Sequence, residues 1–271
     1  MSCRPQDKAK HCEDAMIQLS TADGHTLSAY RADPPGAPKG AVVVLQEMFG
    51  LTDHIRRTAD DFAARGYVAV APALFDRVQP DVELSYDEEG FARGVSLMEE
   101  VGRERALNDI QAAVDAVKDA GKVAIVGFSW GGYLAYEGGN QIRNVACTIG
   151  YYAAGVVAGM AEKRRVPTLL HFAENDPLLP MDLVGEFRQR RPDVSAFAYP
   201  GATHGFTCAE RHTYHAEATG KALDRTLSWI SQYVEGQSPV LLKNAGAYAQ
   251  AKTEKKKSKK PEADDLGPPM D

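Results

Sequence analysis

Residues 122–132 have the sequence KVAIVGFSWGG. The first part is a continuous apolar run, typical of a strand that is buried on both faces, and the pattern Gly-x-Ser-x-Gly then leads directly into a helix-like segment. Gly127 and Gly131 permit a tight turn from strand to helix, because a side chain at either position would crowd the neighbouring backbone. Such a turn presents Ser129 at its tip. The stretch therefore predicts a serine nucleophile rather than a plain glycine-rich turn.

Similar apolar runs recur along the chain and alternate with stretches of helical periodicity. The runs lie at 41–45, 67–71, 123–126, 145–151, 168–172 and 194–199. The helix-like stretches lie at 53–64, 103–119, 131–137, 181–190 and 212–233. This alternation predicts a mostly parallel central sheet flanked by helices, with right-handed crossovers. Two shorter segments, 16–20 and 26–31, flank an Asp-Gly turn and predict an antiparallel hairpin at the N-terminus.

The chain divides into three regions by composition. We expect an N-terminal extension at 1–14, one catalytic domain at 15–236 and a largely disordered C-terminal tail at 237–271, because that tail combines a lysine run at 255–260 with acidic residues and prolines. Within the domain, segment 75–102 is longer and more polar than a simple connection, so we expect it to form a cap or rim over the site. In stretch 103–119, Asp109 falls off the apolar stripe and is expected to face solvent.

Charge and composition exclude several classes of function. The net charge of −6 leaves no excess of positive charge to bind a nucleic-acid backbone. Neither a signal peptide nor a membrane anchor is indicated in the sequence, so we expect a cytoplasmic monomer that acts on a small molecule. The four cysteines lack the spacing of metal or redox sites and are interpreted as free thiols.

A serine hydroxyl needs a positioned base, and the base needs a carboxylate to orient it. His204 lies in a turn-rich loop after the last predicted strand, whereas His171 lies within a strand and is interpreted as a histidine of the core or one that supports the site without contacting the substrate. Asp176 follows the strand at 168–172, with Glu174 as its local rival and a helix-capping role as the alternative. The chain order Ser129, Asp176, His204 is that of the α/β-hydrolase fold.

The strand at 41–45 leads into Gln46-Glu47-Met48-Phe49-Gly50. In an α/β hydrolase this loop supplies the second oxyanion donor, so the backbone N–H groups of Met48 and Trp130 are predicted to form an oxyanion hole. A charged Glu47 beside the nucleophile is costly to bury without a partner, which predicts a catalytic role, with a structural hydrogen bond as the alternative.

Four aromatic rings are candidates for a substrate pocket. The rings of Phe49, Tyr86 and Phe206, together with the Trp130 indole, are predicted to line an apolar pocket. Core packing is the alternative for each of them.

With these residues identified, the chain resembles the dienelactone hydrolase family of α/β hydrolases from about residue 17 to residue 234. The similarity rests on the QEMFG loop at 46–50, on GFSWGG at 127–132, on Asn-Asp-Pro at 175–177 and on GATHGF at 201–206. The resemblance implies a sheet of eight or so strands, no metal or organic cofactor, and hydrolysis of enol-lactones or related esters through an acyl-enzyme.

The sequence departs from the family pattern at three points. Well-known members have cysteine as the nucleophile, where this chain has Ser129, and they hold a substrate carboxylate with two arginines, where this chain has Cys208 and Asp87. Arg77 and Arg93 in the expected cap are candidate substitutes, with a solvated surface position as the alternative. The departures favour neutral esters or lactones. A thioesterase or peptidase with the same triad, and a binding protein without catalysis, remain the alternative functions.

Overall fold

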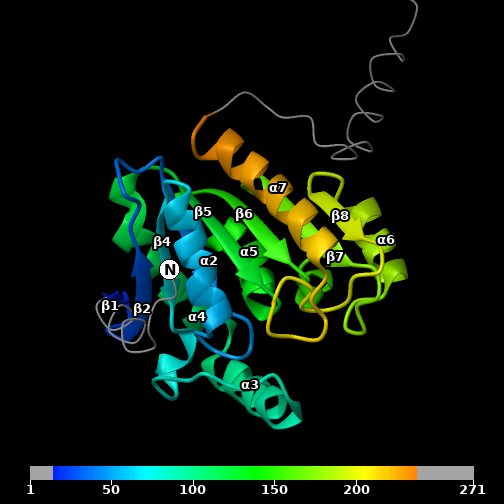
Figure 1. Cartoon of the computed structure of the whole chain (residues 1–271), viewed down its shortest axis with the longest axis horizontal. Helices are drawn as coiled ribbons and strands as arrows, with labels where there is room; N and C mark the ends of the chain where they lie inside the picture. The colour runs from blue at the N-terminus through cyan, green and yellow to red at the C-terminus, as the bar shows by residue number, and fades with distance from the viewer. Residues whose placement is uncertain (1–14, 237–271) are drawn as a thin grey trace, which may run out of the picture.

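The computed structural model describes residues 15–236, so the predictions for the extension and the tail lie outside the described residues. An eight-stranded sheet has the order β1-β2-β4-β3-β5-β6-β7-β8 (Figure 1). Strand β2 pairs antiparallel with β1 and with β4, and all other neighbours run parallel. The predicted mostly parallel sheet with an N-terminal antiparallel hairpin is confirmed.

The strands and helices have the following bounds. The strands are β1 (Met16–Ser20), β2 (Thr26–Ala32), β3 (Ala41–Leu45), β4 (Val68–Pro72), β5 (Val123–Phe128), β6 (Val145–Tyr151), β7 (Thr168–Ala173) and β8 (Ser195–Tyr199). The α-helices are α2 (Asp53–Ala64), α3 (Glu88–Val101), α4 (Arg103–Val117), α5 (Trp130–Gln141), α6 (Met181–Arg190) and α7 (Ala216–Tyr233). Short 3₁₀ turns occur at η1 (Leu74–Arg77), η2 (Lys118–Ala120) and η3 (Ala154–Val157).

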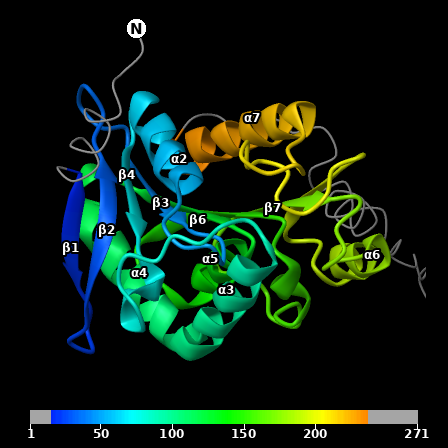
Figure 2. The ribbon, with the colours of Figure 1, turned by 60° about the horizontal axis from the view of Figure 1, so that its bottom comes forward.

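The continuous apolar strands are explained by helices on both faces of the sheet. Helices α2 and α7 cover one face, and α4 and α5 cover the other (Figure 2). Along β3, Val42 and Val44 pack toward α2 and α7, whereas Val43 and Leu45 pack toward α4 and α5. Every residue of β3 is buried, which is the pattern expected of a parallel strand between two helical layers.

The structure differs from the sequence-based prediction at two helices. Helix α3 was not predicted; it begins where the Asp87 carboxylate accepts a hydrogen bond from the Gly90 N–H at 2.8 Å, a side-chain cap. Helix α7 begins at Ala216 rather than at His212. His215 is its N-cap, because a ring nitrogen of His215 accepts a hydrogen bond from the Ala218 N–H at 3.2 Å.

The prediction for Asp109 is wrong. Asp109 is fully buried, and its carboxylate accepts two hydrogen bonds from Arg77, of 2.9 Å from Nε and 2.8 Å from Nη2. Arg77 also pairs with Asp23 of the β1–β2 turn at 2.8 Å. The guanidinium therefore connects the hairpin and η1 to α4, and this arrangement makes the burial of the charge tolerable.

Within residues 15–236, no helix has the length and apolar character needed to cross a membrane.

A buried polar network lies in the core between the sheet and α7. His171 of β7 is a core histidine, as predicted; its Nδ1 lies 2.7 Å from the Tyr199 hydroxyl and its Nε2 lies 3.0 Å from Thr226 Oγ1. Thr226 Oγ1 in turn lies 2.6 Å from the Tyr151 hydroxyl. Burial, assisted by the positive charge of Arg225, lowers the pKa of His171 to about 3.

We expect this network to make the fold acid-sensitive. In the unfolded chain a histidine has a pKa of about 6.5, so below that pH the unfolded state binds a proton that the folded state refuses. As the pH is lowered from about 6.5 towards the folded pKa, this residue alone should therefore decrease the free energy of unfolding by about 1.4 kcal/mol for each pH unit. Urea unfolding of the wild type and of His171→Gln at several pH values measures the slope.

The His171→Gln curve should be flatter than that of the wild type over this window. The matched control, His212→Gln, changes an exposed histidine and should keep the wild-type slope. Parallel curves for all three proteins would show that His171 does not carry the acid sensitivity.

Candidate functional site

Ser129 occupies a strained turn between β5 and α5. Its φ of 52° and ψ of −113° are unusual for a residue with a side chain. A Cβ at Gly127 would lie 2.0 Å from the Gly131 carbonyl oxygen, and one at Gly131 would lie 2.5 Å from the Gln46 carbonyl oxygen. Both glycines are therefore required by close backbone approach, and the turn points the serine away from the strand.

The structure brings Ser129, His204 and Asp176 into one hydrogen-bonded row. Ser129 Oγ lies 2.9 Å from His204 Nε2, and His204 Nδ1 lies 2.9 Å from Asp176 Oδ2. All three residues are buried, and the ring edge of Tyr152 packs against the imidazole with centroids 5.0 Å apart. A hydroxyl next to an imidazole that is oriented by a carboxylate is the arrangement needed for nucleophilic attack with general-base assistance.

Asp176 and its local rival Glu174 make different hydrogen bonds. Asp176 uses Oδ2 for His204 and its other oxygen, Oδ1, for the Leu178 N–H at 2.9 Å. Asp176 thus makes a local turn contact and orients the histidine at the same time. Glu174 instead accepts from the Gly201 N–H at 2.9 Å, so its carboxylate holds the loop that carries His204.

The turn that carries Ser129, between β5 and α5, is hydrogen-bonded to the loop after β3. The Gly131 N–H donates to the Gln46 carbonyl at 3.1 Å. The Gln46 side chain accepts from the Leu74 N–H at 3.0 Å and donates to the Glu47 carbonyl at 3.3 Å, so both ends of its amide fix the loop. Trp130 is the first residue of α5, and its N–H therefore has no acceptor within the helix. This leaves the Trp130 N–H available beside Ser129, at the positive end of the helix dipole.

Glu47 is almost fully buried, at 1% exposure, and its two carboxylate oxygens have no hydrogen bond from the described residues. The nearest cation is Arg211, whose Nη1 lies 3.6 Å from Glu47 Oε1. The Arg211 guanidinium also lies over the rings of Phe49 and Tyr86, 5.5 and 5.6 Å from their centroids. Sequence reasoning missed Arg211, because it follows His204 by seven residues in an irregular loop and belongs to no motif.

A cleft of about 450 Å³ opens at Ser129. Its walls are mostly apolar and include Met48, Met98, Trp130, Tyr133 and Leu178. Two charged residues, Glu99 and Arg103, also line it, and Arg103 pairs with Glu137 at 3.0 Å.

Helix α3 forms one border of this cleft through Met98 and Glu99, so the end of segment 75–102 is a rim, as predicted, whereas residues 75–83 do not line the cleft. A Cβ at Gly94 would lie 2.3 Å from the Met48 carbonyl oxygen, so the glycine lets α3 lie directly on the loop that carries Met48. In Figure 2 this helix lies below the sheet, on the side of α4 and α5. The rim and the expected oxyanion loop are thus packed together.

The three other rings proposed for the pocket lie elsewhere. Phe206 is fully buried in the core, where it packs against Tyr152 and Tyr199. Phe49 and Tyr86 contact each other edge to face at 4.8 Å, beneath Arg211. None of the three is among the residues that line the cleft at Ser129.

The two cap arginines do not face the cleft either. Arg77 is buried against Asp109 and Asp23, and Arg93 is an exposed side chain that bonds Gln79 at 2.9 Å.

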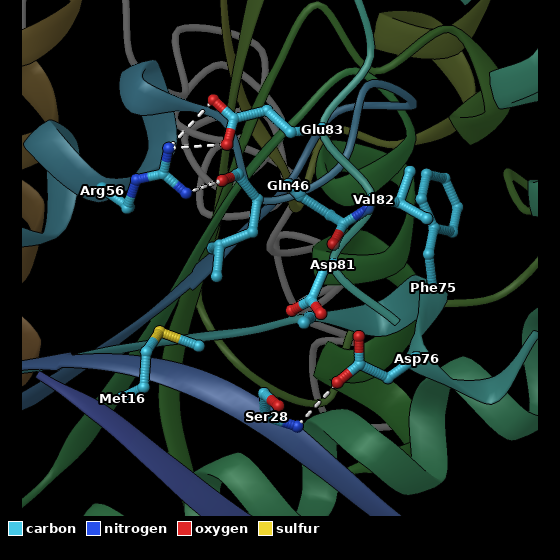
Figure 3. A pocket seen from close by; sticks show the side chains of 11 residues that line it. Met16, Ser28, Gln46, Arg56, Phe75, Asp76, Asp81, Val82 and Glu83 are labelled. Carbon is cyan, nitrogen blue, oxygen red and sulfur yellow. Dashed lines mark hydrogen bonds and ion pairs between the residues drawn. The ribbon is translucent and has the colours of Figure 1, made fainter. Parts of the chain in front are cut away.

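A second cavity, of about 300 Å³, is lined by Gln46 and by residues of β2, η1 and the segment after it (Figure 3). It contains Asp76 and Glu83, but the Asp76 carboxylate accepts from the Ser28 N–H at 2.8 Å and Glu83 pairs with Arg56 at 2.7 Å. These two carboxylates are occupied by structural contacts, and no histidine is among the described residues that line this cavity. The cleft at Ser129 is therefore the better candidate for an active site.

Comparisons with known proteins found a matching family model, similar sequences and similar solved structures. The model of the dienelactone hydrolase family matches residues 27–234. A "putative carboxymethylenebutenolidase" of Synechocystis sp. is 31% identical over 72% of this chain and 87% of the relative. The carboxymethylenebutenolidase of Pseudomonas putida is 29% identical over 79% of this chain and 95% of the relative. The crystal structure of a "putative dienelactone hydrolase" from Klebsiella pneumoniae superposes with a TM-score of 0.69 at 26% identity and covers 81% of this chain and 100% of its own.

Proposed function

The chain belongs to the dienelactone hydrolase family of α/β hydrolases and is a hydrolase of esters or lactones, and from this premise we propose that it acts through an acyl-enzyme on Ser129. The observation that supports the proposal is the row of hydrogen bonds from Ser129 through His204 to Asp176, in which Ser129 lines a mostly apolar cleft.

The proposed reaction has two halves. Ser129 Oγ attacks the carbonyl carbon while its proton passes to Nε2 of His204, and Asp176 stabilises the imidazolium that forms. The N–H groups of Met48 and Trp130 donate to the oxyanion of the tetrahedral intermediate. Cleavage of the C–O bond then releases the alcohol oxygen, which takes the proton from His204. Water activated by the same imidazole hydrolyses the acyl-enzyme and restores the serine hydroxyl.

A panel of neutral aryl esters, lactones, thioesters and peptides tests the class of substrate. Turnover of oxygen esters or lactones above that of thioesters and peptides supports the proposal. A preference for thioesters or peptides would reassign the same triad to that chemistry. Complete lack of turnover would favour a binding protein instead.

Glu47 has a positioning role in this proposal. Its buried charge holds Arg211 beside the loop, and the next residue supplies the proposed Met48 donor. Because loss of one oxyanion donor typically costs about 100- to 1,000-fold in kcat, a partial displacement of that loop should cost at least about tenfold. We therefore expect Glu47→Gln to lower kcat by at least about tenfold while the protein still folds, as measured by steady-state kinetics and thermal unfolding.

Glu83→Gln is the matched control, because it removes a carboxylate that also pairs with an arginine but lies at the second cavity. It should leave kcat close to that of the wild type. Unchanged kinetics in Glu47→Gln would reduce this residue to part of the scaffold.

A further inference from the structure

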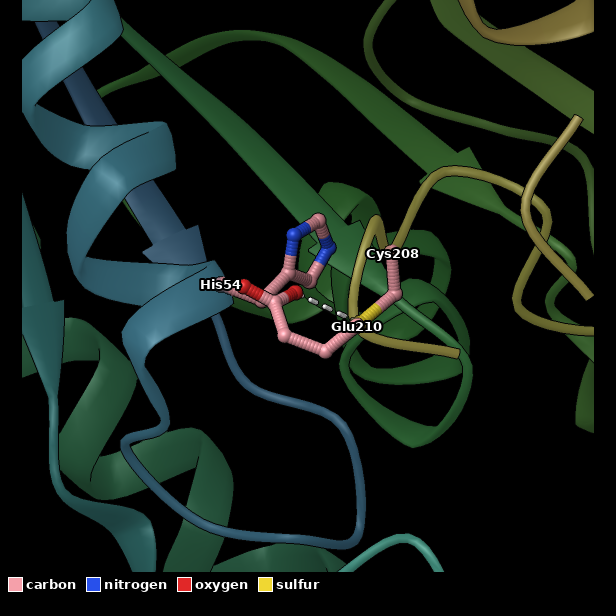
Figure 4. Close-up of side chains that lie close together, drawn as sticks. All are labelled: His54, Cys208 and Glu210. Atoms are coloured by element: carbon pink, nitrogen blue, oxygen red, sulfur yellow. Dashed lines mark hydrogen bonds between the residues drawn. The ribbon is translucent and has the colours of Figure 1, made fainter. Parts of the chain in front are cut away.

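Three side chains of metal-binding type converge outside the cleft. His54 from the first turn of α2 lies beside Cys208 and Glu210, which belong to the loop between His204 and α7 (Figure 4). One ligand atom from each lies within 4.8 Å of the others. His54 and Cys208 are buried, whereas Glu210 reaches them from the surface.

The His54 imidazole gives an independent indication of a ligand. Its Nε2 is buried and has no hydrogen-bond partner among the described residues, although the side chain is only 8% exposed in total. Buried polar atoms in native proteins are nearly always paired, and an orphan of this kind commonly marks a bound water or ion. The ring also makes an edge-to-face contact with Phe128, with centroids 5.2 Å apart.

We propose that His54, Cys208 and Glu210 form a binding site for a thiophilic divalent cation such as Zn²⁺. Thiolate, imidazole and carboxylate are ligands that Zn²⁺ takes together, whereas Mg²⁺ and Ca²⁺ prefer oxygen alone. In tetrahedral zinc sites the Zn–S bond is about 2.3 Å and the Zn–N and Zn–O bonds are about 2.0–2.2 Å, so neighbouring ligand atoms lie about 3.5 Å apart. Small side-chain rotations therefore suffice to close the cluster, and water completes the fourth position.

The contacts of Glu210 are already divided in the way that this site requires. Oε1 pairs with Arg57, while Oε2 accepts the Cys208 S–H at 3.2 Å. When the metal binds, the thiol proton of Cys208 is released to solvent. The metal then takes the place of this proton between Sγ of Cys208 and Oε2 of Glu210, and Arg57 remains paired with Oε1. The thiolate and the carboxylate then balance the two positive charges of the ion. The Tyr86 hydroxyl, which donates to Thr52 Oγ1 at 3.2 Å, also interacts with the same sulfur and lies in the outer surroundings of the site.

Such a site would join α2 to the loop that carries His204. Cys208 follows His204 by four residues, and His54 lies just after the loop of Glu47 and Met48. A bound ion would therefore cross-link two segments that flank the proposed triad, and the fold should gain stability through ligand linkage.

The test titrates Co²⁺, as a spectroscopic substitute for Zn²⁺, into the full chain carrying Cys3→Ser and Cys12→Ser. These substitutions remove the two thiols that lie outside the described residues. We expect one equivalent to bind, with tetrahedral d–d bands and a thiolate charge-transfer band. Zn²⁺ should displace Co²⁺ and raise the melting temperature by about 5 °C or more at a hundredfold excess over Kd.

Two pairs of variants distinguish ligation from simple loss of structure. Cys208→Ser should weaken binding at least about a hundredfold, since even outer-sphere partners are worth about 10- to 100-fold. His54→Gln should also weaken it, whereas the control His212→Gln should not.

The sharpest comparison is between Glu210→Gln and Arg57→Gln. Both break the same surface ion pair, but only Glu210→Gln removes a proposed ligand. Binding should weaken at least about tenfold in Glu210→Gln and should be kept or strengthened in Arg57→Gln, which removes a nearby positive charge. Absence of saturable binding, or binding that survives Cys208→Ser with its charge-transfer band intact, would overturn the proposal.

Discussion

Replacing Ser129 by alanine should lower kcat for an aryl ester by more than about a thousandfold, and His204→Ala should do the same. In the proposed mechanism the two side chains act as one unit, with Oγ as the nucleophile and Nε2, which lies 2.9 Å away, as its base. Removing either one leaves only the oxyanion donors and substrate binding to accelerate the reaction. For the same reason the double variant should be little slower than either single variant.

Labelling with an organophosphonate probe provides a direct readout of the nucleophile. The wild type should be modified at Ser129, and Ser129→Ala should not be modified. Ser96→Ala, which changes a half-buried serine of α3 bonded to Glu100, is the control and should label like the wild type. If Ser129→Ala kept comparable turnover, the assignment of the nucleophile would fail.

The parts of the fold and site that depend on local sequence pattern could be predicted. Two glycines flank Ser129 because backbone atoms approach within 2.0 to 2.5 Å of where their Cβ atoms would be, and such positions leave a visible pattern. The strands were recognisable because the central ones are buried on both faces. His204 and Asp176 could be placed because each follows a strand, and parallel strands end at one edge of the sheet.

The parts that depend on long-range pairing could not be predicted. Arg77 meets Asp109 across 32 residues, so the helical stripe of α4 wrongly placed this aspartate in solvent. Arg211 pairs with Glu47 although the two residues are far apart in the sequence, and Arg211 lies in a loop that has no periodic pattern. In both cases the partner of a buried charge is set by tertiary structure, and charge alone carries no signal of it in the sequence.

The same limit applies to the pocket. Aromatic residues near the elbow were expected to line it, but Phe206 packs in the core while Met48, Met98 and Leu178 line the cleft. Apolar character predicts burial without saying which cavity a side chain faces.

Neutral substrates should be hydrolysed faster than those that bear a carboxylate, by about thirtyfold in kcat/KM. A buried charge without its partner typically costs about 2–5 kcal/mol, and the lower figure corresponds to about thirtyfold. Among the described residues that line the cleft, Arg103 is the one cation, and it is engaged by Glu137 and accompanied by Glu99. Arg211 is engaged by Glu47. A substrate carboxylate would therefore meet no unpaired cation, whereas a neutral acyl group meets methionine, leucine and aromatic walls.

The measurement compares a short-chain aryl ester with its ω-carboxylate analogue of equal length, alongside dienelactone, at one pH and one ionic strength. The same leaving group in the two esters confines the difference to the acyl end of the substrate. Arg103→Gln and Arg211→Gln should leave the neutral ester preferred, and Arg93→Gln serves as a control because that side chain bonds Gln79 and Glu100 away from Ser129. The neutral preference is refuted if the carboxylate substrates are faster. In that case, one of the two variants, Arg103→Gln or Arg211→Gln, should lose the faster hydrolysis of carboxylate substrates. That variant would identify the arginine that leaves its carboxylate partner to bind the substrate.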